Sequence, residues 1–156
     1  KRAGELVTLA DVVSEVGADA TRFFFLLPSA GAAMDFDIEL AQKQSDENPV
    51  YYVQYAHARI AGIIAKASDA GLSAERADPA LLTHITEQTL LRKLLLLPEV
   101  VEEVVTELAP HHLPHYAQDL AQAFHVFYTQ CRVVNGDEPE LSRARLLLLK
   151  RQHLHS

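Results

Sequence analysis

Residues 48–60 bring three tyrosines and an arginine together in the sequence NPVYYVQYAHARI. Asn48 is a favoured N-cap and Pro49 suits the first position of a helix, where no N–H is needed, so a helix should begin at Pro49. At 100° per residue, one flank of this helix, beside its apolar stripe, carries Tyr52, Tyr55, Arg59 and Lys66. Because aromatic rings stack on unstacked bases and cations bind phosphates, this flank is suited to single-stranded RNA. The same spacing also fits half-buried core tyrosines beside a solvated arginine.

Other candidate sites carry weaker signals. His111, His112 and His115 could share a helix face, but no cysteine is near and the adjacent prolines place them at a helix start, so we expect no metal site. Asp35 and Asp37 have neither a base nor a nucleophile beside them, and we interpret them as a turn residue and a helix cap. No glycine-rich phosphate loop and no nucleophilic triad is present in the sequence.

The net charge of −7 argues against strong RNA binding, because phosphate contacts require Lys and Arg. The charge is unevenly distributed: residues 48–98 carry 5 basic and 4 acidic groups, and residues 141–156 carry 4 basic groups and no acidic group. The remaining segments are acidic. We therefore expect RNA affinity to be local to the helix that begins at Pro49 and to the C-terminal helix, and weak for the chain alone.

The composition of the 156 residues, 49% hydrophobic with 6 Gly and 7 Pro, is typical of a helix-rich globular chain. No apolar run reaches the roughly 18 residues of a membrane span. Cys131 is the only cysteine, which excludes an internal disulfide and fits a reducing compartment. We expect a cytoplasmic protein.

Caps and helical apolar spacing predict an all-α fold after residue 48. Before it, we expect a helix to Val16 opened by a Thr8–Asp11 capping box and a helix over 20–27 capped by Asp19. A short strand or turn over 34–37 and a helix to about residue 45 should follow. The later helices are predicted over 49–69, over 78–108 with a kink or split at Pro98, up to residue 134, and from about Pro139.

Four blocks of the sequence, in the same order, resemble bacterial arginyl-tRNA synthetases. The first is the Tyr-x-Gln-Tyr-Ala-His-x-Arg run that ends at Arg59, and the second is KRAGELVTL at residues 1–9, which resembles a Lys-Met-Ser-Lys-Ser signature of class I synthetases in its Met-Ser-Lys-Arg-Ala-Gly form. The others are EVGADATRFFF at 15–25 and AFHVFYTQCRV at 123–133. The resemblance covers roughly residues 1–148.

The resemblance implies a division of the chain. Residues 1–46 would be the tail of a class I catalytic domain, a short mixed stem-contact segment, and residues 47–156 a helical anticodon-binding bundle. The chain departs from the family at its end, where residues 150–156 replace a Leu-Gly segment and a Met-ending tail, so we expect the bundle to be truncated at its C-terminus.

The resemblance also implies partners and residue roles. The parent enzyme would attach arginine to its tRNA with ATP and magnesium, through an arginyl-adenylate, while this chain itself holds no cofactor. Lys1 would be the catalytic lysine of a mobile loop that stabilises the ATP phosphates. Tyr52, Tyr55, Arg59 and Lys66 would contact the tRNA anticodon loop. Two alternatives stay open: a helical scaffold that binds protein partners through an apolar groove, and the equivalent domain of a cysteinyl or methionyl synthetase.

We predict that this chain alone does not catalyse adenylate formation, because it would hold only one lysine of the ATP site. Adenylate formation should be measured with arginine, ATP and the cognate tRNA. Turnover that rises in proportion to the amount of this chain would contradict the expected boundaries.

Overall fold

The computed structural model describes the backbone of residues 8–153 and the side chains of residues 8–150. Within this part of the chain the regular structure is helical, and no residue is in a strand. The elements are α1 (Leu9–Val16), α2 (Ala18–Leu26), α3 (Ile38–Gln42), α4 (Pro49–Asp69), η1 (Pro79–Leu81), α5 (Ile85–Leu95), α6 (Leu97–Glu107), α7 (His112–Gln130) and α8 (Pro139–His153). The predicted all-α fold is confirmed.

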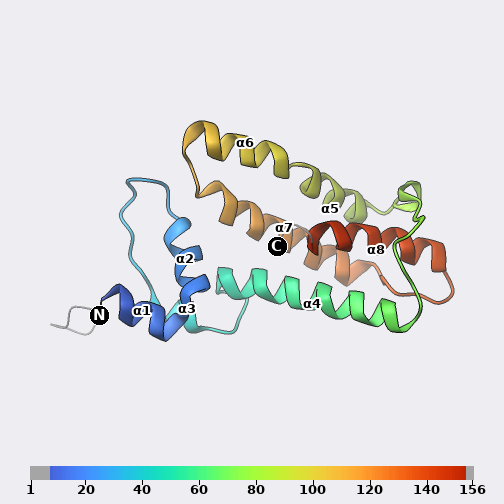
Figure 1. The fold of residues 1–156 in the computed structure, drawn as a ribbon, viewed down its shortest axis with the longest axis horizontal. Helices are drawn as coiled ribbons and strands as arrows, with labels where there is room; N and C mark the ends of the chain where they lie inside the picture. Colours follow the sequence, from blue (N-terminus) through green and yellow to red (C-terminus); the bar gives the residue numbers. More distant parts are fainter. Residues whose placement is uncertain (1–7, 154–156) are drawn as a thin grey trace.

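Helix α7 is the centre of the bundle. It contacts α4 on one side and α5 and α6 on another, while α8 packs against α4, α5 and η1. In Figure 1, α1–α3 gather at one end of the molecule, near the start of α4, and α4–α8 make up the elongated remainder. The two helices that carry the fourth and the first sequence blocks described above, α7 and α4, are therefore neighbours.

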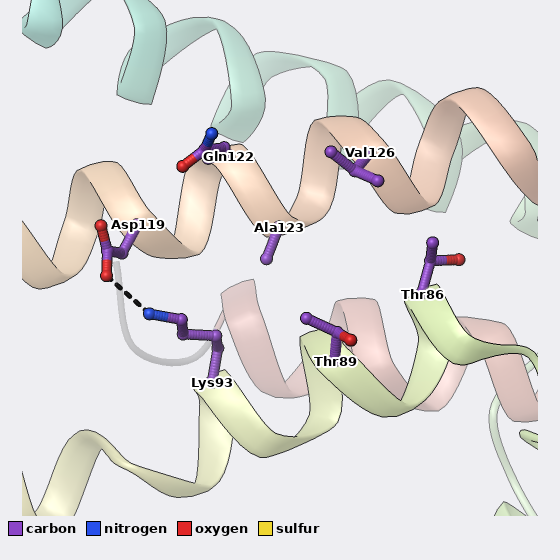
Figure 2. A pocket seen from close by; sticks show the side chains of 7 residues that line it. All are labelled: Thr86, Thr89, Lys93, Asp119, Gln122, Ala123 and Val126. Atoms are coloured by element: carbon purple, nitrogen blue, oxygen red, sulfur yellow. Dashed lines mark hydrogen bonds and ion pairs between the residues drawn. The ribbon is translucent and has the colours of Figure 1, made fainter.

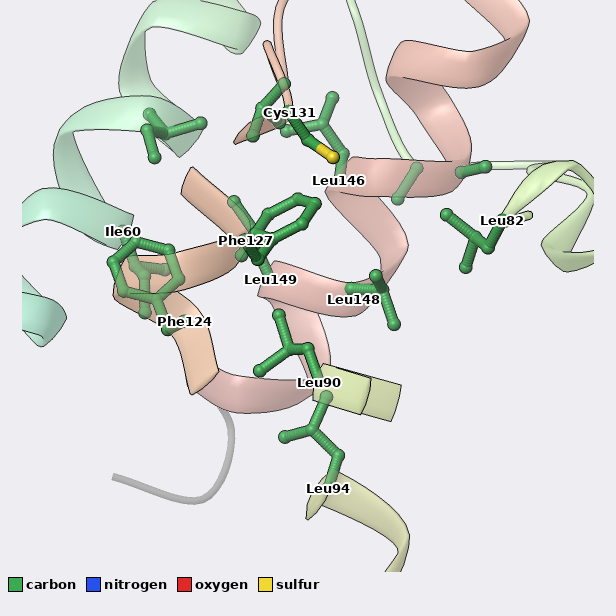
Figure 3. Packing of buried hydrophobic residues seen from close by; sticks show 14 of the residues in the cluster. Ile60, Leu82, Leu90, Leu94, Phe124, Phe127, Cys131, Leu146, Leu148 and Leu149 are labelled. Atoms are coloured by element: carbon green, nitrogen blue, oxygen red, sulfur yellow. The ribbon is translucent and has the colours of Figure 1, made fainter. Parts of the chain in front are cut away.

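The main core lies among α4, α5, α7 and α8. Its fully buried side chains include Phe124 and Phe127 of α7, Leu90 of α5 and Leu149 of α8. Figure 3 shows these side chains interdigitated with Ile60 of α4. A separate, smaller cluster buries Phe24, Ala41 and Val50 between α2, α3 and the start of α4.

Asn48 connects the N-terminal segment to the bundle. Its side-chain oxygen accepts hydrogen bonds from the Val50 and Tyr51 amides, as expected of the N-cap. Its amide group also donates to the carbonyls of Ala41 (3.0 Å) and Lys43 (2.8 Å), at the end of α3. The residue is buried, and with all these partners it fixes where α4 begins and how α3 approaches it.

Several predicted boundaries are wrong by a few residues. Helix α2 begins at Ala18 with Gly17 as N-cap, so Asp19 lies in its first turn instead of capping it. Residues 34–37 form no strand, and Asp37 caps α3 through the Leu40 amide. Helix α7 begins before Pro114 and ends at Gln130.

The expected helix over 78–108 is divided into three elements. Asp78 caps only the short turn η1, and His84 then restarts the chain as the N-cap of α5 in a capping box with Glu87. The second break falls at Leu96, shortly before Pro98. A proline removes one backbone donor and crowds the carbonyl four residues earlier, so the helix ends just ahead of it.

A buried ion pair joins α5 to α8. Glu87 is 1% exposed, and its Oε1 accepts a hydrogen bond from Arg145 Nε at 2.6 Å. Its Oε2 accepts one from the His84 amide, and Arg145 Nη1 donates to the carbonyl of Arg132, just after α7. The pair thus ties together α5, α8 and the segment that follows α7.

We predict that Arg145→Met lowers the free energy of unfolding by about 3–5 kcal/mol, because it leaves the Glu87 carboxylate buried without its cation. Lys43→Met is the matched control: Lys43 pairs with Glu47 at 2.7 Å, but both side chains are exposed. The control should cost about 1 kcal/mol or less. Urea unfolding of both variants measures the difference, and equal losses would contradict a central role for the buried pair.

Candidate nucleic-acid interface

The start of α4 presents its tyrosines beside the core instead of within it. Tyr52 is half-buried and Tyr55 is 40% exposed, whereas Ile60, on the adjoining face, is 2% exposed. Arg59 is half-buried and Lys66 is exposed. Since Lys66 follows Arg59 by about two turns, it extends the same flank of the helix. The predicted orientation of α4 is therefore confirmed.

Arg59 is clamped between two aromatic rings. Its guanidinium carbon lies 4.8 Å from the ring centroid of Tyr55 and 4.6 Å from that of Tyr128 on α7. It also donates a hydrogen bond to the Tyr55 hydroxyl. Among residues 8–150, Arg59 has no carboxylate within ion-pair distance. Its charge is held in a fixed place by rings and is not neutralised.

His125 of α7 lies against the same tyrosines. Its ring centroid is 4.6 Å from that of Tyr52 and 5.5 Å from that of Tyr55, with the latter pair stacked. Burial lowers the pKa of His125 below its ordinary value, the backbone of Tyr52 partly opposes this, and the nearby charge of Arg59 lowers it further. The imidazole is therefore neutral at pH 7.

These five side chains form one continuous surface across two helices, which we call the α4–α7 aromatic surface: Tyr52, Tyr55, Arg59, His125 and Tyr128. It offers exposed ring area for stacking, an uncompensated cation for a phosphate, and a neutral imidazole. This combination is the one used to hold single-stranded nucleotides. The sequence analysis missed His125 and Tyr128 as site residues, although both lie in the block at 123–133 that supported the resemblance.

The other sequence candidates do not join this surface. Lys1 lies outside the described residues. In α8, Arg145 is in the buried pair with Glu87 and Arg143 lies 3.7 Å from Glu140, so the expected positive charge of the C-terminal helix is largely compensated. The expectation that this helix adds RNA affinity is weakened accordingly.

The histidines at the start of α7 are spread apart. His115 Nε2 lies 3.0 Å from the carbonyl of Leu27, which links α7 to the end of α2. Within the described residues, one group of potential metal ligands does converge: Glu103, Glu107 and His112, with ligand atoms within 4.8 Å of one another. Both carboxylates are exposed, as such groups commonly are without an ion, and the expected lack of a metal site stays a prediction.

A second hollow of about 250 Å³ lies between α5 and α7 and is shown in Figure 2. Lys93 and Asp119 face each other across one end of it and form an ion pair at 2.5 Å. Thr89 donates to the carbonyl of Ile85, and Thr86 contacts His84. Because its polar groups are already paired, this hollow offers less to a ligand than the α4–α7 aromatic surface.

No helix within residues 8–153 combines the length and the apolar character that a bilayer crossing requires.

The fold and this surface together define a helical bundle with an aromatic and cationic face built on two adjacent helices. The chain belongs to the DALR anticodon binding domain family, whose model matches residues 53–156. This is the class of domain that the sequence resemblance implied.

Known proteins similar to the chain agree with this assignment. It is 56% identical to an arginine–tRNA ligase of Dehalococcoides mccartyi, over 96% of the chain and 27% of that protein. It is 49% identical to the arginine–tRNA ligase of Heliobacterium modesticaldum, over 96% of the chain and 28% of that protein. A crystal structure of a Campylobacter jejuni protein described as an arginyl-tRNA synthetase matches with a TM-score of 0.81 and 34% identity, over 98% of this chain and 34% of that one.

The chain thus spans about a quarter of the length of the curated relatives it matches. The two alternatives, a protein-binding scaffold and a cysteinyl or methionyl synthetase domain, are not favoured, because the matching family is an anticodon-binding one and these relatives are arginine–tRNA ligases.

We predict that the pKa of His125, measured by NMR titration, lies below its ordinary value of 6.5, and that Arg59→Gln raises it because a nearby positive charge is removed. Lys66→Gln, about two turns away, should leave it unchanged. A depressed pKa in the folded state also means that His125 opposes folding at acid pH: its contribution is present above the unfolded pKa and is lost as the pH falls through the folded pKa. An Arg59→Gln variant with an unaltered His125 pKa would contradict the proximity of the two groups.

Proposed function

We propose that the α4–α7 aromatic surface binds the anticodon loop of a tRNA. The observation that carries the proposal is Arg59: a guanidinium held between the rings of Tyr55 and Tyr128 and not neutralised by any described carboxylate. A buried or paired arginine would have to break an ion pair before it met a phosphate. Arg59 needs only to turn toward one, while Tyr55 offers its exposed face to a base.

The charge distribution supports a local site. The chain as a whole carries −7, and the acidic groups of α6 would repel a polyanion from that side of the bundle. The α4 flank, with Arg59 and Lys66 and no acidic residue in the first turn of the helix, is where an RNA strand would meet the least repulsion. Binding should be selective in place and modest in strength.

We further propose that residues 1–46 are the end of a catalytic domain and residues 47–156 the anticodon-binding domain. Two observations support this boundary: the small cluster around Phe24 is separate from the main core, and Asn48 stands at the junction with hydrogen bonds to both sides. The family match from residue 53 onward is consistent with it.

The whole protein, in this proposal, is a cytoplasmic arginine–tRNA ligase that joins arginine to its tRNA through an arginyl-adenylate. It would use ATP with magnesium, and Lys1 would approach the ATP phosphates. The support is the identity to arginine–tRNA ligases over nearly all of this chain. The domain described here would then supply part of the recognition of the tRNA and none of the chemistry at the amino acid.

We predict that Arg59→Ala weakens binding of an arginine tRNA anticodon stem-loop by about 1–3 kcal/mol and lowers the dependence of log Kd on log salt by about one unit. Stability should fall by only about 1 kcal/mol, the loss of cation–π contacts at a partly exposed site. Fluorescence anisotropy at several salt concentrations and urea unfolding measure the two quantities.

Ile60→Ala, one residue further along α4, is the matched control. It should cost about 2–5 kcal/mol of stability by opening a cavity, and leave RNA affinity per folded molecule unchanged. If Arg59→Ala instead unfolds the protein while the affinity of the folded fraction stays the same, Arg59 is a structural residue and the proposed surface is wrong.

A further inference from the structure

His125 has an unusual feature for a residue in the middle of a packed surface. Its Nε2 atom is buried and has no hydrogen-bond partner among the residues that the structure describes. Buried polar atoms in folded proteins are almost always paired, so an unpaired one calls for an explanation. One explanation is a ligand that supplies the missing partner.

The location of this nitrogen restricts what the ligand can be. The imidazole lies between the rings of Tyr52 and Tyr55, with Phe124 beside it on α7 at 5.5 Å between centroids. A group that reaches it must be flat enough to enter among aromatic rings and must carry a hydrogen-bonding edge. A nucleobase meets both requirements, and stacked bases are what rings of this kind hold.

The charge state of His125 points the same way. Burial and the charge of Arg59 keep the ring neutral at pH 7. A neutral imidazole presents one N–H and one lone pair, which suit the donors and acceptors on a base edge, whereas a phosphate is better met by a full cation. Arg59 supplies that cation on the neighbouring turn of α4, so the two residues divide the recognition of one nucleotide between them.

We infer that His125 reads the edge of one anticodon-loop base through Nε2, while that base stacks on the Tyr55 ring. The inference rests on the proposed function and adds a specificity-determining residue to it. Since Nε2 is covered in the free protein, some of its cover must move as the base enters. Tyr55, the more exposed of the two tyrosines against His125, is the ring that can turn aside; Tyr52 is half-buried in the bundle.

A purely structural role for His125 makes a different prediction. If the ring only spaces the tyrosines, a phenyl ring of similar shape would serve equally well, and RNA binding would not change. His125→Phe therefore separates the two roles. It also removes an unpaired buried nitrogen, so the variant should be at least as stable as the original chain.

The test measures binding of an arginine tRNA anticodon stem-loop to the full chain and to His125→Phe by fluorescence anisotropy, with urea unfolding alongside. We expect affinity to fall by about 3- to 10-fold, the value of one hydrogen bond, with an unchanged or higher unfolding midpoint. Val126→Ala, an exposed neighbour on α7 that lines the hollow between α5 and α7, should not alter the affinity. His125→Gln, which keeps a hydrogen-bonding side chain, should retain more affinity than His125→Phe.

Stem-loops that lack one base at a time complete the test. At the loop position that His125 reads, the missing base should abolish the difference between the original chain and His125→Phe, and at every other position the difference should persist. Unchanged affinity in His125→Phe, or an equal loss with every loop, would overturn the inference. The proposed function would still stand in that case if Arg59→Ala weakens binding, and it would fall, with the inference, if the original chain does not bind the stem-loop at all. Should His125→Phe fail to fold, the side-chain nitrogen resonances of His125 in the original chain decide: an Nε2 shift on adding RNA supports the inference, and an unmoved signal in the bound state overturns it.

Discussion

The buried ion pair of Glu87 and Arg145 is the interaction on which the arrangement of the bundle depends. A charge removed from water is costly unless it is paired and hydrogen-bonded, and here the carboxylate meets both Arg145 and the His84 amide. The guanidinium in turn binds the carbonyl of Arg132. Few alternative packings of α5 and α8 would satisfy all of these groups at once. The pair therefore favours one register of the helices around α7.

That register matters because the candidate site is not on one helix. Tyr52, Tyr55 and Arg59 come from α4, and His125 and Tyr128 come from α7, so the surface exists only when these two helices are packed side by side, as in Figure 1. Helix α8 contacts both α4 and α5, and the ion pair anchors it. Stability in the core and the geometry of the aromatic surface are in this way connected through α8.

The sequence predicted the local features well. Asn48, Pro49 and the apolar spacing that follows contain enough information to place α4 and to orient its tyrosines, because helix caps and amphipathic stripes depend on near neighbours. Longer-range features were not predictable. Nothing near residue 59 indicates that Tyr128 supplies the second ring of the clamp, and nothing near residue 145 indicates that its arginine is buried in an ion pair instead of facing RNA. Overall charge counts treated both arginines alike, although the fold leaves one available and neutralises the other.

The most direct test of the account is to locate the RNA on the protein. An anticodon stem-loop with 4-thiouridine in the loop should be irradiated in complex with the full chain, and the cross-linked peptides identified by mass spectrometry. The account predicts cross-links to Tyr55 of α4 and to Tyr128 or its neighbours in α7, which disappear when unlabelled stem-loop competes. Cross-links concentrated on α6 or in the hollow between α5 and α7, with none on α4, would contradict it.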